Sequence, residues 1–183
     1  MIVYADFTSA FCYLASLRVD RLTATHDTPV DWRAIEHRPG LTRPGLQLSS
    51  TAQVIRGREL TAARSLLTHR EQFPARNPRF LPNVNAANTA YATARVKGLG
   101  ERARRVLFDA YWVQGLHIGR VEVLQHLLPE AFDSNGPMIS TSDWQSEWLA
   151  LGTCIDLTIV SALQVACGRS ALDQLIECPL RVA

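Results

Sequence analysis

The residues best suited to chemistry lie at the first predicted strand-to-helix junction, Ser9-Ala10-Phe11-Cys12. A side chain at a helix N-terminus faces unpaired backbone N–H groups and the positive end of the helix dipole. A cysteine in that position loses its proton readily and becomes a nucleophile. Here the position is held by Ser9, whose hydroxyl cannot carry out thiol–disulfide exchange, and Cys12 follows one turn into the helix. A two-cysteine redox cycle is therefore not expected at this junction.

Ser9 and Cys12 also have ordinary structural interpretations. Serine is a favoured N-cap, so Ser9 can cap the helix with or without a role in binding. Cys12 can be a small buried residue on the core face of the helix. The remaining cysteines (Cys154, Cys167 and Cys178) form no Cys-x-x-Cys pair, and the histidines lack the spacing of a zinc site. We therefore expect free thiols and no metal, and leave open an approach of Cys154 to Cys12.

A strand–helix–strand unit is predicted to position the junction. Residues 2–7 form a short apolar run that is typical of a strand. Residues 10–25 carry apolar side chains at helical spacing, with Arg18 and Arg21 on the opposite face. Residues 30–34 alternate between apolar and polar side chains, which indicates a second strand. Such a unit favours two parallel strands joined by a right-handed crossover.

The rest of the chain is predicted to be mainly helical. The expected helices cover about residues 51–72, 85–97, 101–114, 121–128, 142–151 and 169–177. Ser142-Asp143 is expected to cap the helix over residues 142–151. The expected loops cover residues 38–50, 73–83 and 133–137. Residues 157–160 predict a strand and residues 163–166 a second one, although Ser161-Ala162 is poor hairpin-turn chemistry. Strands at both ends of a helical block indicate one sheet interrupted by an insertion.

Three segments carry a resemblance to a known family. Residues 6–15 resemble the active-site start of the DsbA family, in which cysteine usually stands where this chain has Ser9. In the branch that contains 2-hydroxychromene-2-carboxylate isomerase and kappa-class glutathione transferase, that residue is serine. The chain resembles this branch and the polyketide-biosynthesis oxidoreductases near it. Residues 81–127, with Ala87-Asn88-Thr89, are similar to the helical insertion of those proteins, and residues 168–172 to the start of their last helix.

This resemblance implies an α/β, thioredoxin-like fold with a central mixed sheet and a large all-helical insertion. Residues 1–40 and 138–183 would form the thioredoxin-like domain, and residues 41–137 the insertion. Ser9 would hydrogen-bond the sulfur of glutathione or another low-molecular-weight thiol and hold it as the thiolate. The other expected contacts to thiol or substrate are Ala10, Phe11, Asp156, Leu157 and Thr158.

Two landmarks of the family's site are changed in this sequence. The proline of the first motif is replaced by Ala10. Thioredoxin-fold enzymes also carry a cis-proline before the third strand, but this chain has no proline between Pro137 and Pro179. The corresponding position falls at Asp156 or Leu157. Because a cis bond without proline costs about 3 kcal/mol, we expect a trans bond there.

Two functions stay open from the sequence. The first is a thiol-dependent isomerase or transferase, or an atypical oxidoreductase, that acts on a small molecule with Ser9 and Cys12 at its site. The second is a non-catalytic binding or interaction module with the same fold. A weaker third is a one-cysteine redox protein that works through Cys12.

Charge and hydropathy limit the partners. The net charge of +2 gives no strong field for nucleic acid. No apolar run reaches the roughly 20 residues that cross a bilayer, and the N-terminus lacks the basic region of a signal peptide. We expect a cytoplasmic protein that binds neither nucleic acid nor membrane, and leave a homodimer open.

Overall fold

The first strand, helix and second strand form the predicted parallel unit. β1 (Ile2–Ala5) leads into α1 (Ala10–His26), which returns to β2 (Asp31–Ala34). The strands are parallel, with Val3 opposite Trp32. These elements come from a computed structural model, which describes residues 1–26, 28–75, 77–132, 138–152, 155–162 and 164–177.

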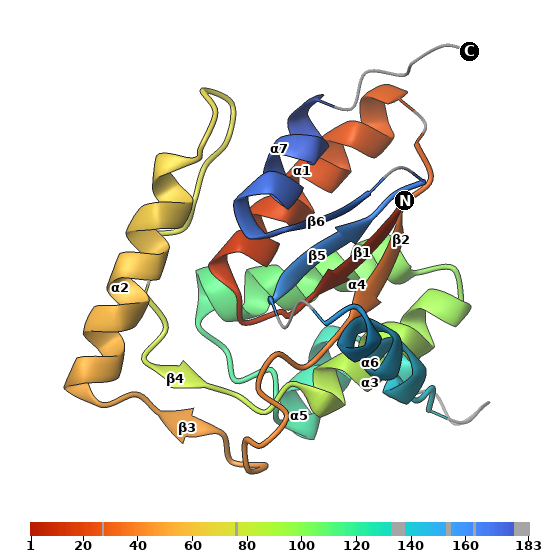
Figure 1. The fold of residues 1–183 in the computed structure, drawn as a ribbon. Coiled ribbons are helices and arrows are strands. Elements are labelled where there is room, and N and C mark those ends of the chain that lie inside the picture. The colour runs from red at the N-terminus through yellow and green to blue at the C-terminus, as the bar shows by residue number, and fades with distance from the viewer. Residues whose placement is uncertain (27, 76, 133–137, 153–154, 163, 178–183) are drawn as a thin grey trace.

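The chain then completes a four-stranded mixed sheet in the order β2-β1-β5-β6 (Figure 1). β5 (Leu157–Val160) lies antiparallel to β1, and β6 (Val165–Cys167) lies antiparallel to β5. A hairpin joins β5 to β6, with the Ser161 N–H donating to the Gln164 carbonyl at 3.0 Å. The poor turn composition was therefore a misleading signal, and β6 lies closer to the C-terminus than the sequence predicted.

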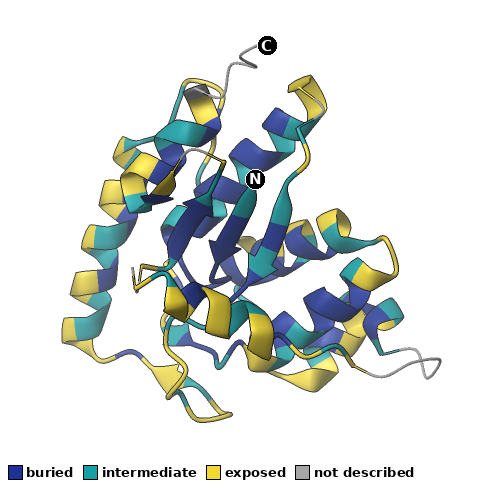
Figure 2. Cartoon of the chain, turned by 45° about the vertical axis from the view of Figure 1, so that its right-hand side comes forward, coloured by how far each residue is buried: buried dark blue, intermediate teal, exposed yellow. Residues whose placement is uncertain are grey.

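The two faces of the sheet pack against different helices. On one face, Val3, Trp32 and Ile159 join the main core with side chains from the middle of the chain. On the other face, Tyr4 and Trp148 form a second apolar cluster, and Trp148 belongs to α6 (Ser142–Ala150). Figure 2 shows the strands as the buried centre between these layers. The mixed sheet with helical segments confirms the predicted fold class.

The central helices are close to those predicted. They are α2 (Ser50–Ser65), α3 (Asn85–Val96), α4 (Gly100–Asp109) and α5 (Val121–Leu127). A π-helical turn, Ala110–Gln114, continues α4, and a 3-10 turn, Pro129–Ala131, follows α5. The last helix, α7 (Gly168–Glu177), lies along α1 (Figure 1).

Three local expectations were wrong. α2 ends at Ser65 instead of continuing to residue 72, and the chain turns back at Glu71. Two segments predicted as loops pair as β3 (Leu46–Gln47) and β4 (Phe80–Leu81), which are too short to show a strand period. The residue at the N-cap of α6 is Thr141, without a side-chain cap bond, and Ser142 is already helical.

Arg18 corrects the predicted outer face of α1. Its guanidinium is buried, with Nε donating to Glu71 Oε1 at 2.9 Å and Nη1 donating to the Leu172 carbonyl at 2.9 Å. α7 and the segment after α2 cover the face that the sequence assigned to solvent. Arg21, predicted on the same face, stays partly exposed and reaches the same carboxylate at 3.4 Å.

The four strands come from both ends of the chain, and α2 to α5 lie between them in sequence. The exact division at residues 40 and 138 stays a prediction. Within the described residues, no helix combines the length and apolar character needed to cross a membrane.

Candidate functional site

Ser9 begins α1 as its N-cap, as its residue type predicted. Its Oγ accepts a hydrogen bond from the Cys12 N–H at 3.2 Å, and its carbonyl accepts from the Tyr13 N–H at 3.0 Å. Its own N–H donates to the Asp6 carbonyl at 3.1 Å. Thr8, Ser9 and Ala10 are each less than a tenth exposed. The start of α1 is therefore closed by its own chain.

The Asp6 carboxylate shapes the turn that leads into Ser9. Its Oδ1 accepts from the Thr8 N–H at 2.6 Å and from the Thr8 hydroxyl at 2.7 Å. Its Oδ2 accepts from the His37 N–H at 2.9 Å, which joins the turn to the segment after β2. The family motif contains this aspartate, but the sequence did not indicate its structural task.

Cys12 lies beside Ser9 as a buried, protonated thiol. Its Sγ donates to the Asp156 carbonyl at 2.9 Å, and the side chain is fully buried. Burial raises the pKa of the Cys12 thiol well above its ordinary value, the negative charge of Asp156 adds to this, and the Ser9 hydroxyl opposes it. A thiol that stays protonated is a poor nucleophile. The interpretation of Cys12 as a buried core residue is confirmed, and Cys154 lies outside the described residues.

The other predicted contact residues divide into two groups. Phe11 and Asp156 are partly exposed, and the Asp156 carbonyl already accepts from Cys12. Leu157 and Thr158 are fully buried in β5, where Thr158 Oγ1 bonds the Ile155 carbonyl at 3.1 Å. No peptide bond among the described residues is cis, as expected for Asp156 and Leu157. Contact of these residues with a ligand stays a prediction.

Arg56 is a site residue that the sequence did not indicate. It comes from α2, and its Nη2 donates to the Thr8 carbonyl at 2.6 Å and to the Tyr111 hydroxyl at 3.2 Å. Its guanidinium lies 4.9 Å from the centre of the Trp112 ring, and the residue is only 5% exposed. The Arg56 Nε–H has no hydrogen-bond partner among the described residues. A fixed positive charge thus lies on the backbone just before Ser9.

Arg56 has two further neighbours that define its surroundings. Its Nη1 lies 3.8 Å from the Glu59 carboxylate, a contact at the edge of an ion pair. Burial raises the pKa of Tyr111 to about 12, so this hydroxyl stays neutral and donates to the Phe80 carbonyl at 2.8 Å. In the described part of the chain, no group of three or more His, Cys, Asp or Glu side chains is placed to hold a metal ion.

The fold is shared with several solved structures of low sequence identity. A probable DsbA oxidoreductase from Streptomyces coelicolor is 16% identical over 100% of this chain and 92% of its own, with a TM-score of 0.70. The cytosolic disulfide reductase DsbM from Pseudomonas aeruginosa, solved with GSH, is 18% identical over 91% and 89%, with a TM-score of 0.62. A 2-hydroxychromene-2-carboxylate isomerase is 19% identical over 96% and 91%, with a TM-score of 0.58.

These three structures establish likeness of fold alone. No curated protein matches the sequence. The family comparison is more direct, because the DSBA-like thioredoxin domain matches residues 1–131, from β1 to the turn after α5. The chain therefore belongs to the family of DSBA-like thioredoxin domains.

Proposed function

We propose that this protein is a thiol-dependent enzyme, an isomerase or transferase, in which Ser9 orients the sulfur of a low-molecular-weight thiol. The observation that carries the proposal is the buried guanidinium of Arg56. It lies on the Thr8 carbonyl, and its Nε–H has no partner among the residues described. A buried donor without an acceptor is costly, and an anionic ligand atom would satisfy it.

The donors at the start of α1 suit a thiolate. The Ser9 oxygen accepts from the Cys12 N–H, and its hydroxyl hydrogen, which now faces the Cys12 thiol, would donate to a bound sulfur instead. α1 has 17 residues, so its dipole adds a positive potential at the same place. Together with the Arg56 charge, these groups would lower the pKa of a bound thiol.

A bound thiol would supply the nucleophilic sulfur that the buried Cys12 does not provide. Cys12 cannot take that role while its Sγ donates to the Asp156 carbonyl inside the protein. The chain's own residues would bind the thiol, hold it as the thiolate through Ser9 and place it before an electrophilic substrate. The structure of DsbM with GSH supports thiol binding on this fold, and DsbM is a cytosolic reductase. We propose the reducing cytoplasm as the compartment here as well.

A non-catalytic binding module is the second candidate, favoured by the closure of the site. Thr8, Ser9 and Ala10 are nearly covered, and five cavities bounded by described residues are lined by side chains other than Ser9 and Cys12. Binding of a thiol at Ser9 therefore requires side chains to move. If these side chains do not move, no thiol reaches Ser9, and the protein has the family's fold without thiol-dependent catalysis.

A thermal-shift experiment separates the two candidates. Glutathione and other biological thiols are expected to raise the melting temperature, whereas S-methylglutathione, which cannot form a thiolate, has a much smaller effect. Ser9→Gly removes the hydroxyl at a cap cost of only about a few tenths of a kcal/mol. The matched control is Ser49→Gly, since Ser49 caps α2 through the Ala52 N–H at 3.3 Å and is exposed.

The result that supports the enzyme is a thiol-dependent shift in the unmodified protein and in Ser49→Gly, and its loss in Ser9→Gly. Absence of any shift with every thiol tested contradicts the proposal and favours the binding module. An equal shift in all three proteins places the thiol elsewhere and contradicts the role of Ser9.

A further inference from the structure

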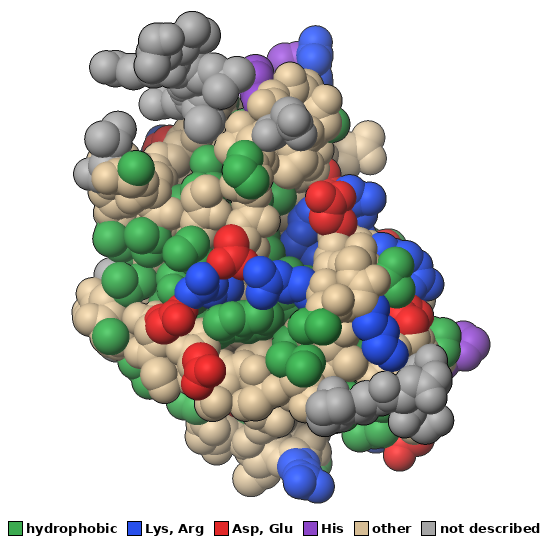
Figure 3. All heavy atoms as spheres, turned by 90° about the vertical axis from the view of Figure 1, so that its right-hand side faces the viewer, with side chains coloured by type: hydrophobic (Ala, Val, Ile, Leu, Met, Phe, Trp, Pro, Cys, Tyr) green, Lys and Arg blue, Asp and Glu red, His purple; other side chains and the backbone are tan. Residues whose placement is uncertain are grey.

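A cavity of about 690 Å³ lies at the opposite end of the parallel strands from Ser9. Ser9 follows the carboxyl end of β1, whereas the cavity is lined by Pro29 and Val30 at the start of β2. α1 runs back across the sheet, so residues of its second half, Val19 and Thr23, also line it. Figure 3 shows this side of the molecule, where basic side chains gather around a hollow with acidic ones beside them.

The N-terminus of α4 opens on this cavity without a cap. Leu99 holds the N-cap position and has no side-chain acceptor, so no side chain bonds the first N–H groups of this ten-residue helix. Gly98, with φ 78°, turns the chain into the helix, and Gly100 adds no side chain in front of those amides. Gly98, Leu99 and Gly100 all line the cavity. Uncapped amides and the helix dipole favour an anion at such a place.

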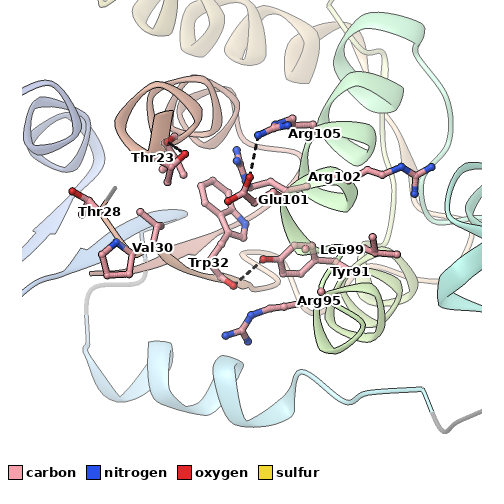
Figure 4. Close-up of a pocket in the computed structure, with 15 residues that line it drawn as sticks. Thr23, Thr28, Val30, Trp32, Tyr91, Arg95, Leu99, Glu101, Arg102 and Arg105 are labelled. Carbon is pink, nitrogen blue, oxygen red and sulfur yellow. Dashed lines mark hydrogen bonds and ion pairs between the residues drawn. The ribbon is translucent and has the colours of Figure 1, made fainter. Parts of the chain in front are cut away.

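Trp32 is the second, independent indication of a ligand. The residue lines the cavity, is 3% exposed, and its indole N–H has no partner among the described residues. Figure 4 shows the indole nitrogen on the ring edge that faces Leu99 and Glu101, toward the start of α4. The Tyr91 hydroxyl donates to the Trp32 carbonyl at 3.0 Å, which fixes the strand that carries the indole. A buried N–H donor calls for an acceptor.

Arginines outnumber acidic residues among the side chains that line the cavity. Four arginines line it, and Glu101 is the acidic residue among the lining side chains; the arginines are Arg95, Arg102, Arg104 and Arg105. Their acidic partners Asp31, Glu130 and Asp20 lie outside the lining. Each guanidinium has five N–H donors, and one carboxylate cannot use them all.

Glu101 is the acidic side chain of the lining itself, and its charge opposes an anion. Its side chain is 67% exposed and bonds Arg105 at 3.2 Å. Figure 4 shows its carboxylate between Trp32 and Arg105. Because the side chain is exposed and flexible, it can turn toward solvent when a ligand enters.

The rest of the lining is partly apolar. Val19, Val30, Leu99 and the rings of Trp32 and Tyr91 line it beside the hydroxyl-bearing Thr23 and Thr28. Cavities of 300–1,000 Å³ with apolar walls and a few convergent polar groups are typical small-molecule sites. The charged and apolar parts together fit a ligand with a flat apolar body and a charged end.

We propose that this cavity binds a small organic anion, a carboxylate or a phosphate on an aromatic body, with the anionic group at the N-terminus of α4. The indole N–H of Trp32 donates to the same oxygen atoms, and Arg105, which bonds Glu101, supplies charge at the mouth. The site shares no residue with the Ser9 site, so it stands or falls independently of the thiol proposal.

Calorimetric titration of the whole chain with three probes tests the ligand class. Phenyl phosphate carries a phosphate, benzoate a carboxylate, and benzyl alcohol the same ring without charge. Binding of either anion, with benzyl alcohol at least about tenfold weaker, supports the proposal, and the ratio of phenyl phosphate to benzoate identifies the preferred anion. Equal binding of the neutral alcohol, or no binding of either anion, overturns it.

The indole signal of Trp32 tests the location. The chain has four tryptophans, so its ¹H–¹⁵N spectrum has four indole signals, and Trp32→Phe identifies the one concerned. That signal should move on saturation with the anion. Binding that leaves it unmoved overturns the assignment even if Trp32→Phe itself proves unstable.

Charge variants complete the test without disturbing the core. Arg105→Gln, at a side chain that is 53% exposed, should weaken anion binding about 2- to 5-fold, and Glu101→Gln should strengthen it by a similar factor. Arg58→Gln, an exposed arginine of α2, is the matched control and should leave the affinity unchanged. Equal affinities for Arg105→Gln, Glu101→Gln and Arg58→Gln contradict the site.

Discussion

The N-termini of α1 and α4 lie at opposite ends of the parallel strands and differ in how their polar groups are hydrogen-bonded. At the first, Ser9 caps α1, and the Cys12 thiol bonds the Asp156 carbonyl, so the polar groups are satisfied by the chain itself. At the second, Leu99 leaves α4 uncapped, and the Trp32 indole N–H lacks a partner in the described structure. The place where this family is expected to do its chemistry is closed, and the opposite end is open.

A family motif and an unsatisfied binding site therefore lie at different ends of this molecule. The residue types around Ser9 identify the family, yet their hydrogen bonds are mostly used within the protein. Arg56 is the exception at that end, because its Nε–H has no described partner. The following predictions test whether the two ends differ as strongly in solution.

The largest effect is expected from a change of Glu71. This residue anchors the middle of α1, the helix that runs between the two ends of the parallel strands. Glu71→Gln leaves the Arg18 guanidinium buried without its full countercharge, since the two side chains are 0% and 2% exposed. Breaking such a pair costs about 3–5 kcal/mol in the free energy of unfolding, measured in urea.

The control is Glu122→Gln on α5, an exposed residue, with a change below about 0.5 kcal/mol. A loss below about 1 kcal/mol for Glu71→Gln would mean that α1 is held by apolar packing alone.

The next largest effect is expected in the rate at which the Cys12 thiol is alkylated. Because burial raises the pKa of its thiol, alkylation at pH 8 should be on the order of 100-fold slower than for the partly exposed Cys167. Peptide mapping by mass spectrometry gives both rates in one sample. In urea the two rates should converge, and fast labelling of Cys12 in the folded protein would instead revive the one-cysteine redox hypothesis.

The pH dependence of stability follows from the same Glu71. Burial alone would raise the pKa of this carboxyl, but hydrogen bonds from Arg18 and the Thr68 N–H, with the charges of Arg18 and Arg21, lower it overall. The unfolded chain therefore binds this proton more tightly. The contribution of Glu71 is complete above its ordinary pKa of 4.5 and is lost as the pH falls through the lower folded value.

Urea unfolding between pH 7 and pH 3 measures this effect. The difference in unfolding free energy between the unmodified protein and Glu71→Gln should narrow below pH 4.5. A constant difference across that range would show that Glu71 keeps its ordinary pKa in the folded protein.

The sequence was most informative where local spacing decides the structure. Helical spacing gave α1 almost to the residue, and alternation gave β2 and its parallel pairing with β1. The cap at Ser9 followed from residue type, because a serine before an apolar helical pattern has a local partner two or three residues on. These features depend on neighbours in sequence.

The sequence was least informative about buried arginines. Arg18, Arg56 and Arg104 are each 2–5% exposed, and each bonds a carbonyl at least 40 residues away in sequence. A charged residue on a helix is ordinarily assigned to solvent. Only the fold reveals which distant carbonyls and carboxylates satisfy it, so both sites were incomplete from the sequence.

The smallest expected effect is the difference in unfolding free energy between removal of two serine caps. Ser9→Ala removes the acceptor of the Cys12 N–H in a buried turn, and should cost about 1 kcal/mol or more in unfolding free energy. Ser49→Ala removes the same kind of cap from α2, where the site is exposed and water can replace the hydroxyl, so about 0.5 kcal/mol is expected. Urea unfolding measures both, and the difference reports how completely the start of α1 is shielded from water. Equal costs would show that water reaches Ser9 and that the start of α1 is less closed than the Cys12 hydrogen bonds indicate.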